Sequence, residues 1–147
     1  MDIKIKRFDT QFPLPKPEDG AACFDFVCRE TVTIPPRAMK SVAQNVALKV
    51  PHGYALLMFS RSSTPLRKGL MLTNGVGVVD PFYCGDNDEC LAFFLNVTDE
   101  PVTVESGDKV VQGMFIKTEA VTWREVEEMQ DDGHGGYNHL DELKHLS

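Results

Sequence analysis

Short segments rich in Val, Ile, Phe and Thr recur along the chain, and turn sequences containing Pro, Gly, Asn or Asp separate them. These residue types favour strands, and many short strands at regular spacing are typical of a β-sandwich or barrel. With 147 residues, of which 42% are hydrophobic, the chain is long enough for one domain with its own core. The expected strands span residues 3–7, 22–29, 31–34, 41–50, 54–60, 70–72, 76–79, 90–97, 102–104, 109–117 and 121–126.

Helical signals are restricted to two short segments. At residues 63–67, Thr64 can cap a helix, Pro65 suits the first helical position and Gly69 ends the helix after one or two turns. Residues 138–146 place leucines at three-residue intervals after an Asn that can cap, but this segment is too short to be stable alone. We therefore expect an all-β fold with at most one short helix.

Residues 131–136, Asp-Asp-Gly-His-Gly-Gly, have the composition of a flexible joint. The joint predicts a β domain over residues 1–130 and a C-terminal arm over residues 131–147. From residue 119 to the end, eight acids stand against two bases, so most of the net charge of −7 lies in this part of the chain.

Composition and charge argue against several classes of function. An acidic chain is a poor non-specific nucleic-acid binder, because that binding needs clustered Lys and Arg. No apolar run approaches the roughly 18–20 residues of a membrane-spanning helix, so we expect no membrane partner. Residues 1–7 alternate charged and apolar side chains and lack the apolar region of a signal peptide. A cytoplasmic location is expected, or a nuclear one in a eukaryote.

The chain has four cysteines, at positions 23, 28, 84 and 90, with four and five residues inside the two pairs. Structural zinc sites usually have closer pairs, and disulfides are rare in the cytoplasm. We expect reduced thiols. Zinc binding and disulfide formation are the alternatives.

Asp80 is the first candidate catalytic residue. It follows an apolar run and precedes a Pro-containing bend, with Tyr83 close by in the sequence. A carboxylate there can face a pocket and accept a proton from water, and the aromatic ring can stack on a ligand. The alternative is a turn aspartate that caps its own backbone.

Three further stretches carry polar residues in suggestive places. Residues 60–64, Ser-Arg-Ser-Ser-Thr, place hydroxyls beside Arg61 at a helix start, which suits either a phosphate cradle or an ordinary cap. Gln112 interrupts an apolar run, so it either binds a ligand oxygen or faces solvent. Asp25 lies among apolar residues and needs partners or a cation; the alternative is a satisfied structural carboxylate. No P-loop sequence is present.

These stretches, in this order and at this spacing, resemble the motifs of the trimeric dUTP diphosphatases (dUTPases). Residues 20–26 are similar to the first motif, Ala-Ala-Gly-Tyr-Asp-Leu, and residues 61–63 to the second, Arg-Ser-Gly or Arg-Ser-Ser. Residues 74–85 resemble the third, Gly-Val-Ile-Asp-x-x-Tyr-x-Gly, which is the most specific, and residues 107–112 resemble the fourth, Gly-Asp-Arg-Ile-Ala-Gln. The resemblance covers residues 18 to 118.

The resemblance implies a jelly-roll protomer, a homotrimer with sites at the subunit interfaces, and magnesium-assisted hydrolysis of dUTP to dUMP and pyrophosphate. It implies that Arg61, Ser62 and Ser63 hold the α- and β-phosphates. Gln112 would bind phosphate oxygens, and Asp25 would hold Mg²⁺ through water, as hard cations prefer.

For the nucleoside, the resemblance implies a uracil pocket formed by the hairpin from Asn74 to Tyr83, including Gly77 and Val79. Its backbone would reproduce a pairing edge, and its walls would leave no room for a 5-methyl group. Tyr83 would pack on the deoxyribose where a 2′-hydroxyl would clash. Asp80 would orient and deprotonate the water that attacks the α-phosphorus in line.

The last motif of the family, Arg-Gly-Gly-Phe-Gly-Ser-Thr-Gly, is matched only in part, at residues 134–140. Tyr137 would replace the stacking Phe, and His134 would be a weaker, pH-dependent substitute for Arg. In a second register His134 is the stacking residue and no cation remains. We therefore expect a weaker hold on the γ-phosphate and relaxed discrimination between di- and triphosphates. The alternative is an acidic C-terminus without function.

Two other functions stay open. The dCTP deaminases share the fold and use a Ser-Arg pair that Ser60 and Arg61 resemble, although residues 80–83 fit the diphosphatases better. The second alternative is a catalytically impaired module that binds dUTP or a protein partner without turnover. Stoichiometric zinc would favour a third interpretation, in which the four cysteines form a zinc site.

Overall fold

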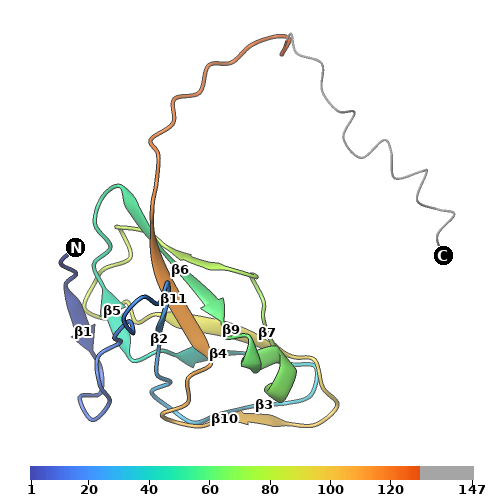
Figure 1. The fold of residues 1–147 in the computed structure, drawn as a ribbon. Helices are drawn as coiled ribbons and strands as arrows, with labels where there is room; N and C mark the ends of the chain where they lie inside the picture. Colours follow the sequence, from blue (N-terminus) through green and yellow to red (C-terminus); the bar gives the residue numbers. More distant parts are fainter. Residues whose placement is uncertain (130–147) are drawn as a thin grey trace, which may run out of the picture.

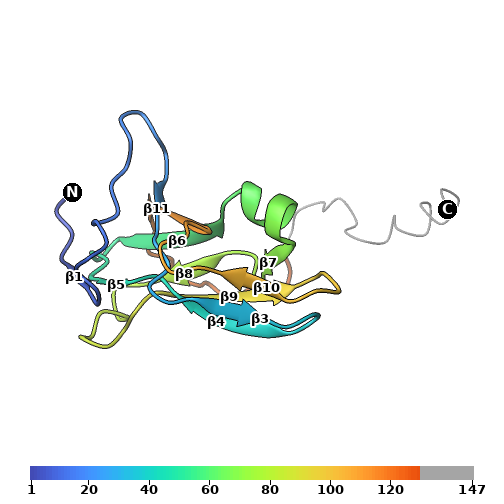
Figure 2. The ribbon, with the colours of Figure 1, turned by 90° about the horizontal axis from the view of Figure 1, so that it is seen from below.

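The computed structural model describes residues 1–129 as a β structure with one short helix (Figure 1). The strands lie in two layers: Figure 2 shows β6 (Tyr54–Ser60) and β11 (Val111–Lys117) over β4 (Met39–Ala43) and β9 (Leu91–Asn96). Within the described residues, no helix has the length and apolar character needed to span a bilayer. The remaining strands are β1 (Ile5–Arg7), β2 (Phe24–Asp25), β3 (Val32–Ile34), β5 (Val46–Leu48), β7 (Leu70–Leu72), β8 (Gly77–Val79) and β10 (Val102–Val104).

The strand pairs given for residues 1–129 are antiparallel, and most join strands that are distant in the sequence. A four-stranded sheet has the order β2-β11-β6-β8, and a three-stranded sheet has the order β4-β9-β7. Two strand pairs, β1-β5 and β10-β3, complete the structure. The core fills the space between the layers, where Phe26, Leu56 and Phe94 are fully buried.

Of the expected strands that form, two differ most from the structure, whereas several others are shorter by one or two residues. The expected strand at residues 41–50 is divided into β4 and β5, because Asn45 adopts a φ of 64° and breaks the ladder. Asn tolerates this left-handed conformation better than most residues. Of residues 22–29, only Phe24 and Asp25 form a strand.

The expected short helix is present as a single turn, η1 (Thr64–Lys68). The assignment of Thr64 as its cap was wrong, because Ser63 occupies the cap position. Thr64 is buried, and its Oγ1 donates a hydrogen bond to the Val110 carbonyl at 2.9 Å. Gly69 ends the helix with a φ of 62°.

The strand expected at residues 121–126 does not form. Beyond β11 the chain leaves the body in an extended path (Figure 1, orange), and no neighbouring strand of the described residues pairs with it. Trp123 is 89% exposed there. The predicted joint at 131–136, the arm at 131–147 and the helical segment at 138–146 lie outside the described residues.

Candidate active site

The four motif stretches meet in one sheet, β2-β11-β6-β8. Asp25 ends β2, Gln112 lies in β11, β6 runs up to Arg61, and β8 precedes Asp80. Gln112 is directly opposite Asp25 on one neighbouring strand and opposite Phe59 on the other. Strand pairing therefore brings together polar residues from both ends of the described chain.

Asp25 lies between two cations at one end of this sheet. Arg61 Nε is 3.2 Å from Asp25 Oδ1, and Lys109 Nζ is 3.7 Å from Oδ2. The three side chains line a cavity of about 410 Å³. Asp25 is half-buried and has the partners that a carboxylate in this position needs. We did not predict Lys109 as a site residue, although it stands three positions before Gln112 in the fourth motif.

Gln112 and the serines after β6 are available to a ligand. Gln112 is half-buried, and its Nε2 reaches the Ser60 carbonyl at the long distance of 3.5 Å. Ser62 is exposed. Ser63 occupies the cap position of η1, but its hydroxyl makes no capping hydrogen bond. The alternative of an ordinary capping side chain is therefore not supported at Ser63.

The residues of the third motif surround a second cavity, of about 440 Å³. The Asp80 side chain is exposed there, and its Oδ1 accepts a hydrogen bond from the Phe82 N–H at 2.8 Å. Asp80 thus caps its own turn through one oxygen and also faces a pocket, so both interpretations of the sequence apply. Five predicted residues line this cavity together: Asn74, Gly77, Val79, Asp80 and Tyr83.

Tyr83 forms one wall of the cavity and is held through its hydroxyl. The Tyr83 Oη–H donates to the Glu89 carbonyl at 2.9 Å, and the residue is 40% exposed. Burial, and then the neighbouring Asp88, Cys90 and Glu89, raise the pKa of the phenol above its ordinary value. Tyr83 is therefore a neutral hydrogen-bond donor throughout the physiological range.

Comparison with known proteins decides the family. Residues 10–139 match the family model described as dUTPase, which is most of the chain. The chain belongs to the dUTPase family. It is 36% identical over 116 residues to the deoxyuridine 5′-triphosphate nucleotidohydrolase of Lactococcus lactis, covering 77% of each protein. It is 34% identical over 135 residues to that of Corynebacterium glutamicum, covering 90% of this chain and 89% of the relative.

Solved dUTPase structures have the same fold. A crystal structure of the dUTPase from Streptococcus mutans superposes with a TM-score of 0.74 at 34% identity, over 81% of this chain and 98% of that one. The dUTPase of Staphylococcus bacteriophage 80alpha superposes with a TM-score of 0.77 at 19% identity, over 92% and 94%. The expectation of an all-β fold of the dUTPase type is confirmed.

Several walls of the Asp80 cavity of this dUTPase were not predicted. They come from β6, from β8, and from β9 with the residue before it, segments that meet only in the folded chain. The expected hairpin from Asn74 to Tyr83 was wrong, because β8 pairs with β6 and the preceding strand β7 pairs with β9. An apolar residue on a strand carries no signal in the sequence that distinguishes a pocket wall from a core position. The unpredicted lining residues are Met58, Val78, Cys90, Leu91 and Phe93.

Asp80 and Arg61 lie at opposite ends of β6 in this dUTPase chain. Val79 is opposite Leu56, whereas Arg61 follows the last residue of β6. At about 3.3 Å per residue, Asp80 and Arg61 are roughly 20 Å apart along the strand. They also line different cavities. The described part of one chain does not bring the Asp80 carboxylate and the Arg61 side chain together.

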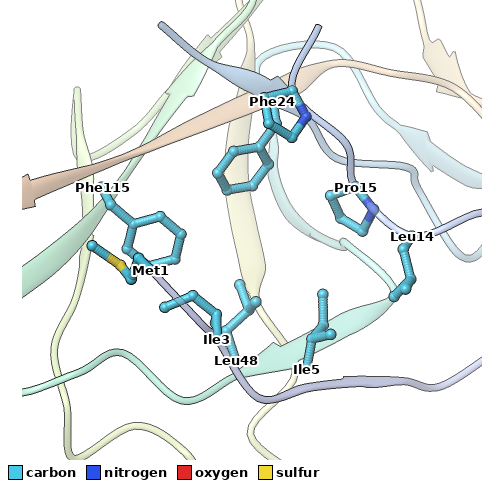
Figure 3. Close-up of a pocket in the computed structure, with 9 residues that line it drawn as sticks. Met1, Ile3, Ile5, Leu14, Pro15, Phe24, Leu48 and Phe115 are labelled. Atoms are coloured by element: carbon cyan, nitrogen blue, oxygen red, sulfur yellow. The ribbon is translucent and has the colours of Figure 1, made fainter. Parts of the chain in front are cut away.

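A third cavity, of about 420 Å³, carries no predicted site residue. Figure 3 shows the rings of Phe24 and Phe115 gathered with Ile3, Ile5 and Leu48 around it. The two ring centroids are 5.9 Å apart. This cavity is lined by apolar side chains and has none of the groups that phosphate or base recognition needs.

The cysteines do not form a metal site among the described residues. All four are free, and burial raises the pKa of Cys28 and of Cys90 to about 12. Within residues 1–129, no three His, Cys, Asp or Glu side chains are grouped to hold a metal ion, so the zinc alternative has no support there. The predicted arm residues His134 and Tyr137 lie outside the described residues.

Proposed function

We propose that this member of the dUTPase family hydrolyses dUTP to dUMP and pyrophosphate. The observation that carries the proposal is the exposed Asp80 carboxylate on the same cavity as Asn74, Gly77 and Tyr83. A carboxylate, backbone groups and an aromatic wall on one cavity suit water activation beside a nucleoside. The named nucleotidohydrolase relatives support the same activity.

Asp80 acts as the general base. A water molecule between its carboxylate and the α-phosphorus gives a proton to Asp80 as the water oxygen attacks. The bond from the α-phosphorus to the bridging oxygen breaks, and pyrophosphate leaves with that oxygen. The hydrogen bond from the Phe82 N–H to Asp80 Oδ1 supports this role, because it fixes the orientation of the carboxylate.

The nucleoside binds against β8 and the turn before it, which precede Asp80. Backbone groups from Asn74 to Val79, with Gly77 between them, reproduce a pairing edge for uracil. Gly77 lies against β6. Because it has no side chain, its backbone can lie close to the Met58 Cβ and carbonyl oxygen. Tyr83 packs on the deoxyribose.

The triphosphate binds at the cation cluster, defined as Asp25, Arg61 and Lys109. Arg61 and Lys109 supply positive charge. Gln112, which lies opposite Asp25 on the neighbouring strand, supplies an amide N–H donor. Ser62 and Ser63 supply hydroxyl and backbone donors beside Arg61. Catalysis at this end is charge neutralisation and positioning rather than covalent chemistry.

Magnesium enters with the triphosphate rather than as a resident ion. Asp25 is already paired with two cations, and no group of three potential ligands occurs among residues 1–129. Such a carboxylate suits contact with a hydrated ion through water. Asp25 would hold Mg²⁺ through water, and the ion would supply neutralisation of phosphate charge.

A homotrimer completes the site in this proposal. The roughly 20 Å between Asp80 and Arg61 along β6 is too long for one α-phosphate to meet both within a chain. A second copy that places its Asp80 cavity over the cation cluster closes that distance. Exposed apolar residues such as Met71 and Phe93 are suitable material for contact between copies.

The test is formation of the nucleoside monophosphate from dUTP, dUDP, dTTP, dCTP and UTP with Mg²⁺, using the wild type and Asp80→Asn. The second product is pyrophosphate for the triphosphates and orthophosphate for dUDP. We expect dUTP to be preferred among the triphosphates, and Asp80→Asn to lower its turnover by about 10²-fold or more. Binding of a non-hydrolysable dUTP analogue should survive. Asp99→Asn, at an exposed aspartate paired with Arg37, is the matched control.

Other outcomes select the alternatives. Ammonia release from dCTP would replace the hydrolase with a deaminase. Tight dUTP binding without pyrophosphate release would leave a nucleotide-binding module. A strong preference for dUTP over dUDP would contradict the expectation that His134, in place of Arg, holds the γ-phosphate weakly.

A further inference from the structure

An ion pair between the buried Glu89 and the half-buried Arg29 adjoins two residues that line the Asp80 cavity, Tyr83 and Cys90. The Glu89 side chain is only 9% exposed. Arg29 approaches it with two nitrogens, Nε at 3.0 Å from Oε1 and Nη2 at 2.9 Å from Oε2. The Asn45 N–H donates to Oε1 at 2.8 Å. A carboxylate with a two-pronged Arg and a backbone donor is held in one orientation.

This carboxylate is anchored to two separate parts of the fold. Arg29 follows the β2 segment, and Asn45 stands between β4 and β5 in its left-handed conformation. Asn45 is itself fixed, because its side chain exchanges hydrogen bonds with the Asp9 N–H at 2.7 Å and the Asp9 carbonyl at 3.0 Å. Glu89 therefore takes its position from the body of the domain rather than from its own loop.

The backbone of the same residue holds Tyr83. The Glu89 carbonyl accepts the Tyr83 hydroxyl, as described above, and the next residue, Cys90, donates its N–H to the Val46 carbonyl at 2.8 Å. Tyr83 is 40% exposed, so neighbouring atoms alone do not enclose its ring. The hydroxyl contact at Glu89 is what ties the free end of the ring to a fixed point.

We propose that Glu89, held by Arg29, is a positioning residue for Tyr83 and thereby sets the discrimination between deoxyribo- and ribonucleotides. The proposal rests on the proposed function, in which Tyr83 packs on the sugar. A 2′-hydroxyl is rejected only by a wall that does not move. A displacement of about 1 Å is enough to change the fit of a reacting substrate. If the Glu89 anchor is weakened, Tyr83 gains that freedom.

Glu89→Gln is the cleaner variant. Gln keeps the size of the side chain and an oxygen for the Asn45 N–H, but it removes the charge that Arg29 meets. Arg29 is then still partly exposed and still paired with Glu30, so it is not stranded. Arg29→Met, in contrast, leaves a carboxylate buried without its cation, which often prevents folding.

The experiment measures kcat/KM for dUTP and UTP in the wild type, Glu89→Gln, Tyr83→Phe and the double variant. We expect Glu89→Gln to lower the dUTP/UTP ratio of kcat/KM by about tenfold, while kcat for dUTP changes by less than about threefold. Tyr83→Phe should lower the ratio similarly. Because both act through one contact, the double variant should be no worse than the worse single variant. Asp99→Asn, which breaks the exposed Arg37 pair, should leave the ratio unchanged.

A second measurement follows Tyr83 directly. In protein labelled with 3-fluorotyrosine, the ¹⁹F signal assigned to Tyr83 by the Tyr83→Phe variant should move toward the random-coil position in Glu89→Gln. An unchanged ratio together with an unchanged signal overturns the proposal, and so do additive effects of the two substitutions. A wild type that turns over neither nucleotide overturns the proposed function instead, and the ¹⁹F signal then decides whether Glu89 positions Tyr83.

Discussion

Arg61 and Asp25 form an ion pair of 3.2 Å that joins the end of β6 to the end of β2 across the intervening strand β11. Lys109 approaches the other carboxylate oxygen from the turn before β11. The carboxylate neutralises part of the charge of two cations that bind the triphosphate in the proposed function. In that proposal its charge influences both substrate binding and pyrophosphate release.

Asp25→Asn should weaken the use of magnesium. The substitution removes the carboxylate that contacts the hydrated ion in the proposed function. Arg61 and Lys109 then compete with Mg²⁺ for the phosphate oxygens. We expect the Mg²⁺ concentration for half-maximal dUTP turnover to rise about tenfold or more. A magnesium titration of turnover measures this, and Asp99→Asn serves as the control. An unchanged titration curve would remove Asp25 from the magnesium contact.

Mixed oligomers should recover activity from two inactive variants. Asp80→Asn and Arg61→Met remove residues that lie at opposite ends of β6 in one chain. If each site takes Asp80 from one copy and Arg61 from another, random assembly of co-expressed variants into trimers restores about a third of the sites in the mixed trimers, which carry both variants. Turnover of the doubly tagged, co-purified protein measures this fraction. No recovery in a stable mixed oligomer would mean that the site is not shared.

Alkaline pH should destabilise the fold through Cys28 and Cys90. Burial, followed by Asp108 for Cys28 and by Glu89 for Cys90, raises each thiol pKa from 9.0 to about 12. Above pH 9 the unfolded chain releases these protons and the folded chain keeps them, so the free energy of unfolding falls as pH rises toward 12. The expected loss is about 1.4 kcal/mol per thiol between pH 8 and pH 10.

Urea unfolding at pH 8 and pH 10 checks this slope. Cys28→Ala lowers stability at pH 8 by leaving a cavity, but it should reduce the loss between the two pH values by the share of one thiol. Cys84→Ala, at an exposed position, should leave the slope as it is. Equal slopes in Cys28→Ala and the wild type would contradict the assignment.

Gly69→Ala should cost more stability than Gly53→Ala. Both glycines have positive φ, 62° and 77°, so an alanine is strained equally in backbone terms at either position. At Gly69 a Cβ would meet the Thr98 methyl group, whereas at Gly53 it would meet open space. We expect Gly69→Ala to be the less stable by about 1–3 kcal/mol in urea unfolding. Equal losses would mean that Thr98 moves aside freely.

The third-motif residues, which the family resemblance indicated, line one cavity because they are nearly contiguous in the sequence. Asn74, Gly77 and Tyr83 lie on β8 and the segments that flank it, so their proximity needs no knowledge of the remaining fold. Phe93 was missed because it reaches the cavity from β9. The pattern of apolar residues in β9 is the same as that of any half-buried strand.

Strand boundaries were less predictable, for two different reasons. The break at Asn45 had a signal, since two polar residues interrupt an apolar run and Asn tolerates a positive φ. Residues 121–126 had a strand pattern, but alternation does not reveal whether a neighbouring strand is present to pair with. Trp123 is accordingly exposed to solvent in the described residues, although it belongs to a segment with a strand pattern.

The pairing of β2 with β11 has a consequence during synthesis. Asp25 emerges early from the ribosome, but its strand partner Gln112 and its cation Lys109 are made only near the end of the domain. Until β11 is released, a nascent chain therefore lacks the strand partner of Asp25, one of its two cations and the complete surface proposed to bind polyphosphate. In that proposal, nucleotide can stabilise the finished domain but cannot guide the folding of its first half.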